Sequence, residues 1–148
     1  MTLPIDVDDT GYKFYKTLNE DIKLVSDEYG VYDICFEETV NDNDFVNLTG
    51  PESLLNGCII AIMTRYQELN TNKTYNDFGC RVHELIKSNR NNLTQYKVEL
   101  FITDTLEKIR RIKSVDEVNV MESDTHNYFV YFIITTHDDE TIKGGLSL

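Results

Sequence analysis

The segment NYFVYFIITT (residues 127–136) decides the fold. In an extended strand, successive side chains point to opposite faces of the sheet. One face would therefore carry Tyr128, Val130, Phe132 and Ile134, and the other Phe129, Tyr131 and Ile133. A strand that is apolar on both sides is usually buried on both. We expect helices to cover one face, and an N-terminal hairpin or else a partner protein to cover the second.

Two further segments with a period of two flank this strand, VDEVNVM (115–121) and ETIKGGLSL (140–148). The short polar connections ESDTH and HDD predict that the three strands form an antiparallel meander. The last strand would lie at the sheet edge, where unpaired N–H and C=O groups are available to another chain. Its paired glycines weaken a strand standing alone and allow a bulge or a close backbone approach. We assign this strand as partner-binding, with the residues Thr141, Ile142, Lys143, Gly144, Gly145, Leu146, Ser147 and Leu148.

Three helices are predicted before the meander. The first spans about 49–69, with Thr49 as N-cap, Pro51 in the first turn and Glu52 completing a capping box. The second spans 78–88 and the third about 94–113. Each has an apolar stripe at helical spacing. The stripes are Leu55, Cys58, Ile59, Ile62, Tyr66 and Leu69; Phe78, Val82, Leu85 and Ile86; and Val98, Phe101, Ile102, Leu106, Ile109 and Ile112.

The N-terminal part is acidic and β-like. Alternating apolar residues in 21–25 and 31–36 predict a hairpin, and NDND (41–44) predicts a turn. Residues 1–20 form either a mobile arm or a first strand. The predicted fold class is α+β, a single domain over 21–148, with three helices packed on a small antiparallel sheet, an N-terminal β-hairpin and a C-terminal edge strand.

Composition excludes several function classes. The 148 residues carry a net charge of −12, and the first 56 residues hold 13 acidic and three basic side chains. This acidity disfavours nucleic-acid binding. The basic cluster Lys108, Arg110, Arg111 and Lys113 is explained better as the C-terminal end of the third helix, where positive charge complements the helix macrodipole. No apolar run is long enough to span a membrane, and no signal peptide is expected. Three cysteines without CxxC spacing suggest reduced thiols.

The segment YNDFGCRVHELI (75–86) is the best candidate for a chemical site, and its residues fall short of one. Cys80 and His83 could supply two zinc ligands, whereas a structural site needs four, and His126 and His137 stand alone. A cysteine nucleophile would need a base and an oxyanion hole, and no glycine-rich turn nearby offers the second. No pair among the 26 acidic residues is marked out by an apolar setting, and no nucleotide-binding or hydrolase motif occurs. We expect no catalytic residue, no metal and no cofactor.

Three elements in this order resemble a known family. They are G-x-x-x-A-I-x-x-R (Gly57 to Arg65), aromatic-G-x-R-x-x-E-L-I (Phe78 to Ile86) and a long helix that ends before V-x-x-V-x-V (Val115, Val118, Val120). The ordered set resembles the baseplate wedge and sheath-initiator family of contractile phage tails. Relatives of that family occur in phage-like injection machines and type VI secretion baseplates. The resemblance covers about residues 20–148.

The resemblance implies a structural protein of the virion tail baseplate, similar to the strand-exchanging domain of the sheath subunit. It would seed the first sheath ring, and its expected partners are the tail sheath protein, baseplate wedge proteins and, as a further neighbour, the tail tube. Arg81 and Glu84, three apart on one helical face, would contact wedge neighbours or each other. Tyr96 and Leu100 lie on the face of the third helix opposite its apolar stripe and complete this helical contact surface.

Two alternatives stay open. Some members of the family have carried a lysozyme label, so a hydrolase of cell-wall glycan is the second hypothesis, although the acid and base expected of such an enzyme are not evident. The third hypothesis is a small adaptor on the same fold that binds a cellular protein through its helical face. Turnover of peptidoglycan would favour the second, and a gene lying away from tail genes would favour the third.

Overall fold

The computed structural model describes residues 20–28, 31–38, 43–85, 87–122 and 127–148. The predicted arm at 1–20, apart from Glu20, and part of the predicted turn at 41–44 lie outside these ranges, as do Ile86 and His126.

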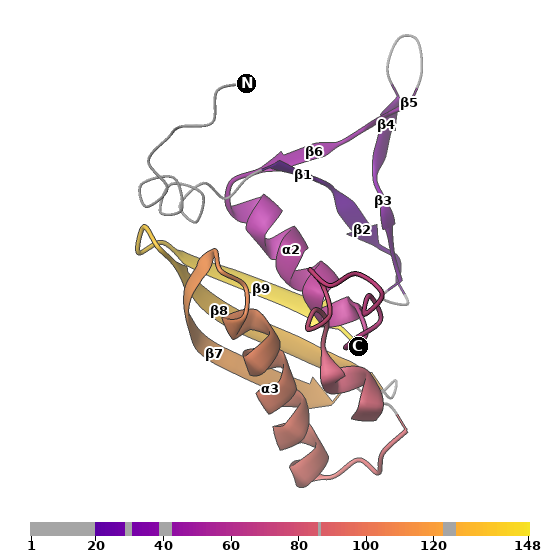
Figure 1. The fold of residues 1–148 in the computed structure, drawn as a ribbon, viewed down its shortest axis with the longest axis vertical. Helices are drawn as coiled ribbons and strands as arrows, with labels where there is room; N and C mark the ends of the chain where they lie inside the picture. Colours follow the sequence, from indigo (N-terminus) through magenta and orange to yellow (C-terminus); the bar gives the residue numbers. More distant parts are fainter. Residues whose placement is uncertain (1–19, 29–30, 39–42, 86, 123–126) are drawn as a thin grey trace.

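The C-terminal half contains the predicted meander. Strands β7 (Ile112–Glu122), β8 (Tyr128–Thr136) and β9 (Thr141–Ser147) form an antiparallel sheet in the order β7-β8-β9. Helices α2 (Pro51–Met63) and α3 (Asn92–Glu107) lie on one face of this sheet (Figure 1). The core between the layers consists mainly of Leu54, Cys58, Ile62, Val98, Ile102, Leu106, Val130, Phe132, Ile134 and Leu146. No helix in the described ranges is long and apolar enough to cross a membrane.

The prediction of three helices on one sheet is wrong. The described chain has two α-helices and four small antiparallel sheets, and the second predicted helix is a single 3-10 turn, η1 (Arg81–Leu85). The reason lies at Gly79, whose φ of 103° is a left-handed conformation that does not propagate a right-handed helix. Beside it, the N–H of Cys80 donates to the carbonyl of Thr64 at 2.8 Å, so this segment is tied to the end of α2.

Both long helices are shorter than predicted. Helix α2 starts after its N-cap residue Gly50, which has φ 63° and no side chain that could cap the helix. The predicted N-cap, Thr49, belongs to a strand instead. It ends at Met63, since Thr64 is extended and the N–H of Tyr66 donates to the carbonyl of Cys80. Helix α3 is capped by the side chain of Asn91 and ends at Glu107. The basic cluster 108–113 therefore follows this helix and leads into β7 instead of closing the helix.

The N-terminal part consists of three two-stranded ribbons, where a single hairpin was predicted. The pairs are β1 (Glu20–Ile22) with β6 (Asn47–Thr49), β2 (Leu24–Ser26) with β3 (Tyr32–Ile34), and β4 (Phe36–Glu38) with β5 (Asn43–Phe45). The predicted hairpin corresponds to β2–β3 alone, since the segments on either side of it pair elsewhere.

A closed cycle of backbone hydrogen bonds joins the three ribbons. The N–H of Lys23 donates to the carbonyl of Val46 at 2.8 Å, Val46 donates to Cys35 at 3.2 Å, and Cys35 donates back to Lys23 at 2.9 Å. Each of these single-residue links thus satisfies its own backbone donor and acceptor. Figure 1 shows the ribbons pointing away from one another.

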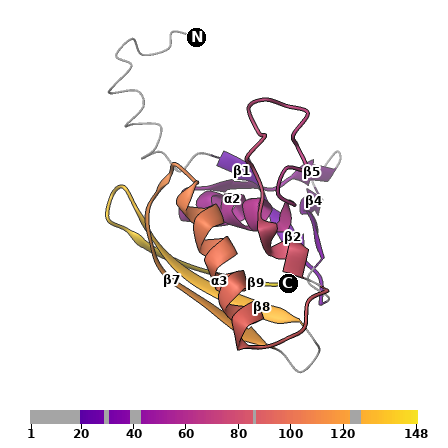
Figure 2. The same ribbon diagram turned by 60° about the horizontal axis from the view of Figure 1, so that its bottom comes forward.

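One buried side chain attaches the ribbons to the helical layer. The Nδ2 group of Asn56 on α2 donates to Oδ2 of Asp21 and to the carbonyl of Ile22, both at 2.9 Å, and its Oδ1 accepts the N–H of Leu24 at 3.3 Å. Helix α2 consequently lies between the ribbons and the C-terminal sheet (Figures 1 and 2). The ribbons therefore do not cover the second face of that sheet, as a hairpin had been expected to do.

Candidate functional site

The outer edge of β9 exposes backbone groups. Tyr128 and Leu148 exchange both of their N–H···O bonds, at 2.9 and 2.8 Å, which fixes the alternation along this antiparallel pair. Ile142, Gly144 and Leu146 therefore direct their N–H and C=O groups toward β8. The residues between them direct theirs away from the sheet, and within the described ranges these groups have no backbone partner. We call this set the open edge: Thr141, Lys143, Gly145 and Ser147.

The opposite edge of the same sheet is covered. Val120 of β7 faces Val130 at a position where its own backbone groups point outward. The side chain of Gln95 on α3 donates to the Val120 carbonyl at 2.5 Å, and Oε1 of Glu99 accepts the Val120 N–H at 3.4 Å. Polar side chains from the helix thus occupy the outward backbone groups of Val120, which an additional strand at β7 would need.

The glycine pair of β9 has a packing role. A Cβ at Gly144 would lie 2.5 Å from the ring of Phe132 and 2.8 Å from Leu55 of α2, so only glycine fits beneath the helix. At Gly145 a Cβ would meet Phe129 at 3.3 Å, which is a milder contact. The β8–β9 register runs without interruption, so the predicted bulge is absent. The other predicted option was a close backbone approach, and the atoms that crowd Gly144 are instead side-chain atoms of Phe132 and Leu55.

The sheet face turned away from the helices is apolar along its centre. Phe129 and Met121 are direct cross-strand neighbours and both are exposed, while Tyr131 and Ile133 are half-buried. The expectation that β8 is buried on both sides is therefore not met by the described residues. We call this surface the open face and define it by Met121, Phe129, Tyr131 and Ile133. It adjoins the open edge through Gly145.

Two of the four predicted helical contact residues pair with each other. The Arg81 guanidinium forms two 3.0 Å hydrogen bonds with the Glu84 carboxylate, and it lies 5.1 Å from the centre of the Phe101 ring. This hydrogen-bonded guanidinium holds the pKa of Glu84 below its usual range. Both side chains are about half exposed, so the pair remains accessible to a partner.

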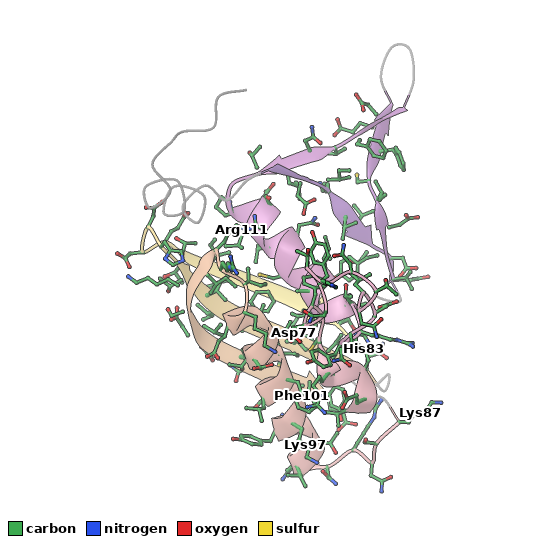
Figure 3. All side chains as sticks on the ribbon, viewed as in Figure 1. Asp77, His83, Lys87, Lys97, Phe101 and Arg111 are labelled. Carbon is green, nitrogen blue, oxygen red and sulfur yellow. The ribbon has the colours of Figure 1, made fainter. Side chains whose placement is uncertain are left out.

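The other two, Tyr96 and Leu100, lie on the outer surface of α3, 61% and 51% exposed. Leu93 extends the same stripe and is also exposed. Leu93 was not predicted from the sequence, although its spacing of three residues from Tyr96 was a usable signal. This stripe and the Arg81–Glu84 pair are neighbours in the helical layer. Arg81 lies over the ring of Phe101, and Phe101 is the residue after Leu100 on α3. Figure 3 shows Phe101 on α3.

The segment 75–85 stabilises the end of α2. A Cβ at Gly79 would lie 2.4 Å from the carbonyl oxygen of Arg65, so glycine permits the two backbones to touch. Cys80 is fully buried, its thiol contacts the Phe101 carbonyl at 3.6 Å, and burial raises its pKa. Nε2 of His83 lies 3.0 Å from the carbonyl of Ile62, and Figure 3 shows His83 beside the end of α2. This segment therefore acts in packing.

The described residues give little support for catalysis by a cysteine nucleophile or by a pair of carboxylates. Burial also raises the pKa of Cys58, to about 12, whereas a nucleophilic thiol needs a lowered pKa. A cavity of about 290 Å³ lies beside α2, with Ile60 and Phe78 in its wall. Its described lining holds one carboxylate, Asp77, near Lys108 and Arg111, whereas glycoside hydrolysis uses two. Nor do three or more His, Cys, Asp or Glu residues of the described ranges gather as metal ligands.

The fold and surfaces define a small domain in which a helix pair covers one face of an antiparallel meander with a free edge strand. No protein-family model matches the sequence, and no curated protein matches it. A similar solved structure is that of a "putative tail lysozyme" from Geobacter sulfurreducens, with a TM-score of 0.57 and 16% sequence identity. The match covers 68% of this chain and 92% of that one. At this identity the likeness shows a shared fold.

Proposed function

We propose that this chain is a structural, non-enzymatic component of a contractile tail that accepts a strand from a sheath subunit at the open edge of β9. The observation that carries the proposal is the asymmetry of the sheet. Among the described residues, the outward backbone groups of Thr141, Lys143, Gly145 and Ser147 have no backbone partner. At β7, by contrast, Gln95 and Glu99 occupy the outward groups of Val120.

Strand addition would use both the edge and its surroundings. An added strand forms backbone hydrogen bonds for affinity, and its alternating side chains give register. Each bond contributes about 0.5–1.5 kcal/mol net, and several loaded in parallel resist pulling. Side chains on one side of the added strand would continue the open face beside Phe129. Those on the other side would approach α2, which already packs against Gly144.

The tail setting rests on two kinds of support. The name of the Geobacter protein that shares this fold contains the word "tail". The ordered motifs Gly57–Arg65 and Phe78–Ile86 resemble sheath initiators of contractile tails. In this proposal the protein sits in the baseplate, links the sheath to wedge proteins and tube, and starts the first sheath ring.

The absence of catalysis is part of the proposal. The Geobacter protein is named a "putative tail lysozyme", and that name applies to the Geobacter protein alone. Here the hydrogen bonds from Arg81 lower the pKa of Glu84, so this particular carboxyl group is unsuited to act as the acid catalyst of glycan cleavage. Purified protein should leave the turbidity of a peptidoglycan suspension unchanged. Clearing that a single Glu→Gln or Asp→Asn substitution abolishes would establish the hydrolase instead.

The decisive experiment compares Lys143→Pro with Lys143→Ala. Proline removes one outward N–H and places its ring at the edge, yet leaves the inward bonds of Ile142 and Gly144 intact. Alanine removes only the side chain. Both variants and the wild type would be titrated against the tail sheath protein encoded nearest to this gene, with circular dichroism confirming the fold.

We expect Lys143→Pro to weaken sheath binding at least about tenfold, since one or more backbone bonds are lost and the edge is blocked. Lys143→Ala should bind as the wild type does. Equal binding by all three proteins would move the contact to the helical surface of Arg81, Glu84, Tyr96 and Leu100. No binding by the wild type would remove the sheath-initiator role and favour an adaptor of another cellular protein.

A further inference from the structure

The ribbon β4–β5 carries an exposed aromatic pair. Phe36 and Phe45 are direct cross-strand partners, and their ring centres lie 5.0 Å apart. They are 54% and 49% exposed, and neither belongs to the hydrophobic core. Two large rings left in water on a six-residue ribbon are unfavourable unless another surface covers them.

The other face of the same ribbon is acidic. Glu37 and Asp44 are also direct cross-strand partners, and both side chains are exposed. Like charges directly opposite each other destabilise a strand pair. Among the described residues, no lysine or arginine lies within ion-pair distance of either carboxylate. From residue 20 to 50 the sequence holds nine acidic side chains and a single basic one, Lys23.

We propose that β4–β5 is a docking ribbon for another protein, whose apolar groove takes the Phe36 and Phe45 rings and whose lysine or arginine side chains face Glu37 and Asp44. Exposed aromatic side chains are effective anchors because they bury much area with few rotatable bonds. Cationic groups at the rim relieve the repulsion between the carboxylates, so charge complementarity selects a basic partner.

The same charge argument excludes two other occupants. A second copy of this chain that docked ribbon to ribbon would bring an equally acidic surface, and a nucleic acid would bring phosphates. The ribbon also points away from the C-terminal sheet in Figure 1. A protein on Phe36 and Phe45 and a strand on β9 can therefore be bound at the same time. The docking ribbon does not depend on the identity of the β9 partner.

The test uses purified products of the genes flanking this one, each titrated against the full-length chain. One variant is Phe36→Ala with Phe45→Ala, which removes both rings. A second is Glu37→Gln with Asp44→Asn, which keeps shape and removes charge. Phe129→Ala is the matched control, because it removes a comparably exposed ring from the open face. Lys143→Pro reports separately on β9.

For one flanking product we expect about 30-fold weaker binding by the ring variant, the loss typical of aromatic anchors. The charge variant should bind about fivefold more weakly at low salt and equal the wild type near about 0.5 M NaCl. Phe129→Ala and Lys143→Pro should bind normally.

The charge variant also separates binding from folding. Because it removes a repulsion, the free chain should show slower amide exchange in β4 and β5 while binding becomes weaker. A purely structural role for Glu37 and Asp44 would change both in the same direction. The proposal is overturned if no flanking product binds the wild type, if the ring variant binds equally well, or if added salt leaves the affinity unchanged.

Discussion

The C-terminal sheet has two edge strands, β7 and β9, and they differ in the side chains that lie beside their outward backbone groups. At β7, the side chains of Gln95 and Glu99 reach from α3 to both backbone groups of Val120. At β9, helix α2 packs over the inner face at Gly144 without reaching the outward groups of Lys143 or Gly145. The difference teaches that the position of the helices decides which edge a partner can use.

The largest effect that sharpens this comparison is expected from Gly144→Ala. The added methyl group would overlap Phe132 and Leu55, and overpacking of this kind costs about 1–3 kcal/mol of unfolding free energy. Gly145→Ala is the control, because its closest contacts are at 3.2 and 3.3 Å, and it should cost less. Urea denaturation of both variants measures the difference. An equal or larger loss of unfolding free energy for Gly145→Ala would mean that packing of α2 is not the reason why residue 144 is a glycine.

Uncovering β7 should have a smaller effect on stability and a new effect on association. Gln95→Ala leaves the Val120 carbonyl without its side-chain donor, which should cost about 1 kcal/mol. Combined with Glu99→Ala it gives the sheet a second free edge, so self-association should appear in sedimentation velocity as concentration rises. Lys97→Ala, on an exposed position of α3 labelled in Figure 3, is the matched control. A strictly monomeric double variant with unchanged stability would show that the β7 edge is not protected by these side chains.

The meander could be predicted from sequence because alternation of apolar residues is a local signal. The helices were predicted less well, because periodicity alone does not show where backbone bonds compete. Phe78, Val82 and Leu85 satisfy a helical stripe, yet Gly79 and the hydrogen bond from the N–H of Cys80 to the carbonyl of Thr64 limit this segment to a 3-10 turn. Tyr66 continues the stripe of the first helix, but its N–H pairs with Cys80.

The candidate surfaces show the same limit. An edge strand at the end of a meander was predictable, whereas the packing of the Phe132 and Leu55 side chains against Gly144 was not. Nor was the cover over Val120, because it depends on the side of the sheet on which Gln95 lies. The ribbon with Phe36 and Phe45 was missed because each of its strands is only three residues long. Aromatics flanked by carboxylates on both sides of NDND were the available signal.

The smallest expected effect comes from an exposed polar contact, the Arg81–Glu84 pair, which contrasts with the polar contacts at β7. Hydrogen bonds from Arg81 lower the folded-state pKa of Glu84, so the pair stabilises the fold above the ordinary carboxyl pKa. That stabilisation is lost as the pH falls through the lowered pKa. Glu84→Gln should therefore unfold at a lower temperature than the wild type at neutral pH, and the two unfolding temperatures should converge in acid.

Because both side chains of this pair are half exposed, solvent and salt screen it, and its effect should be smaller than that of Gln95→Ala. Thermal unfolding at neutral and acid pH, with and without added salt, measures it. A neutral-pH loss that exceeds the Gln95→Ala loss would reverse the ranking. It would mean that the η1–α3 contact around Phe101, and not the covered edge of β7, is the polar interaction on which α3 depends.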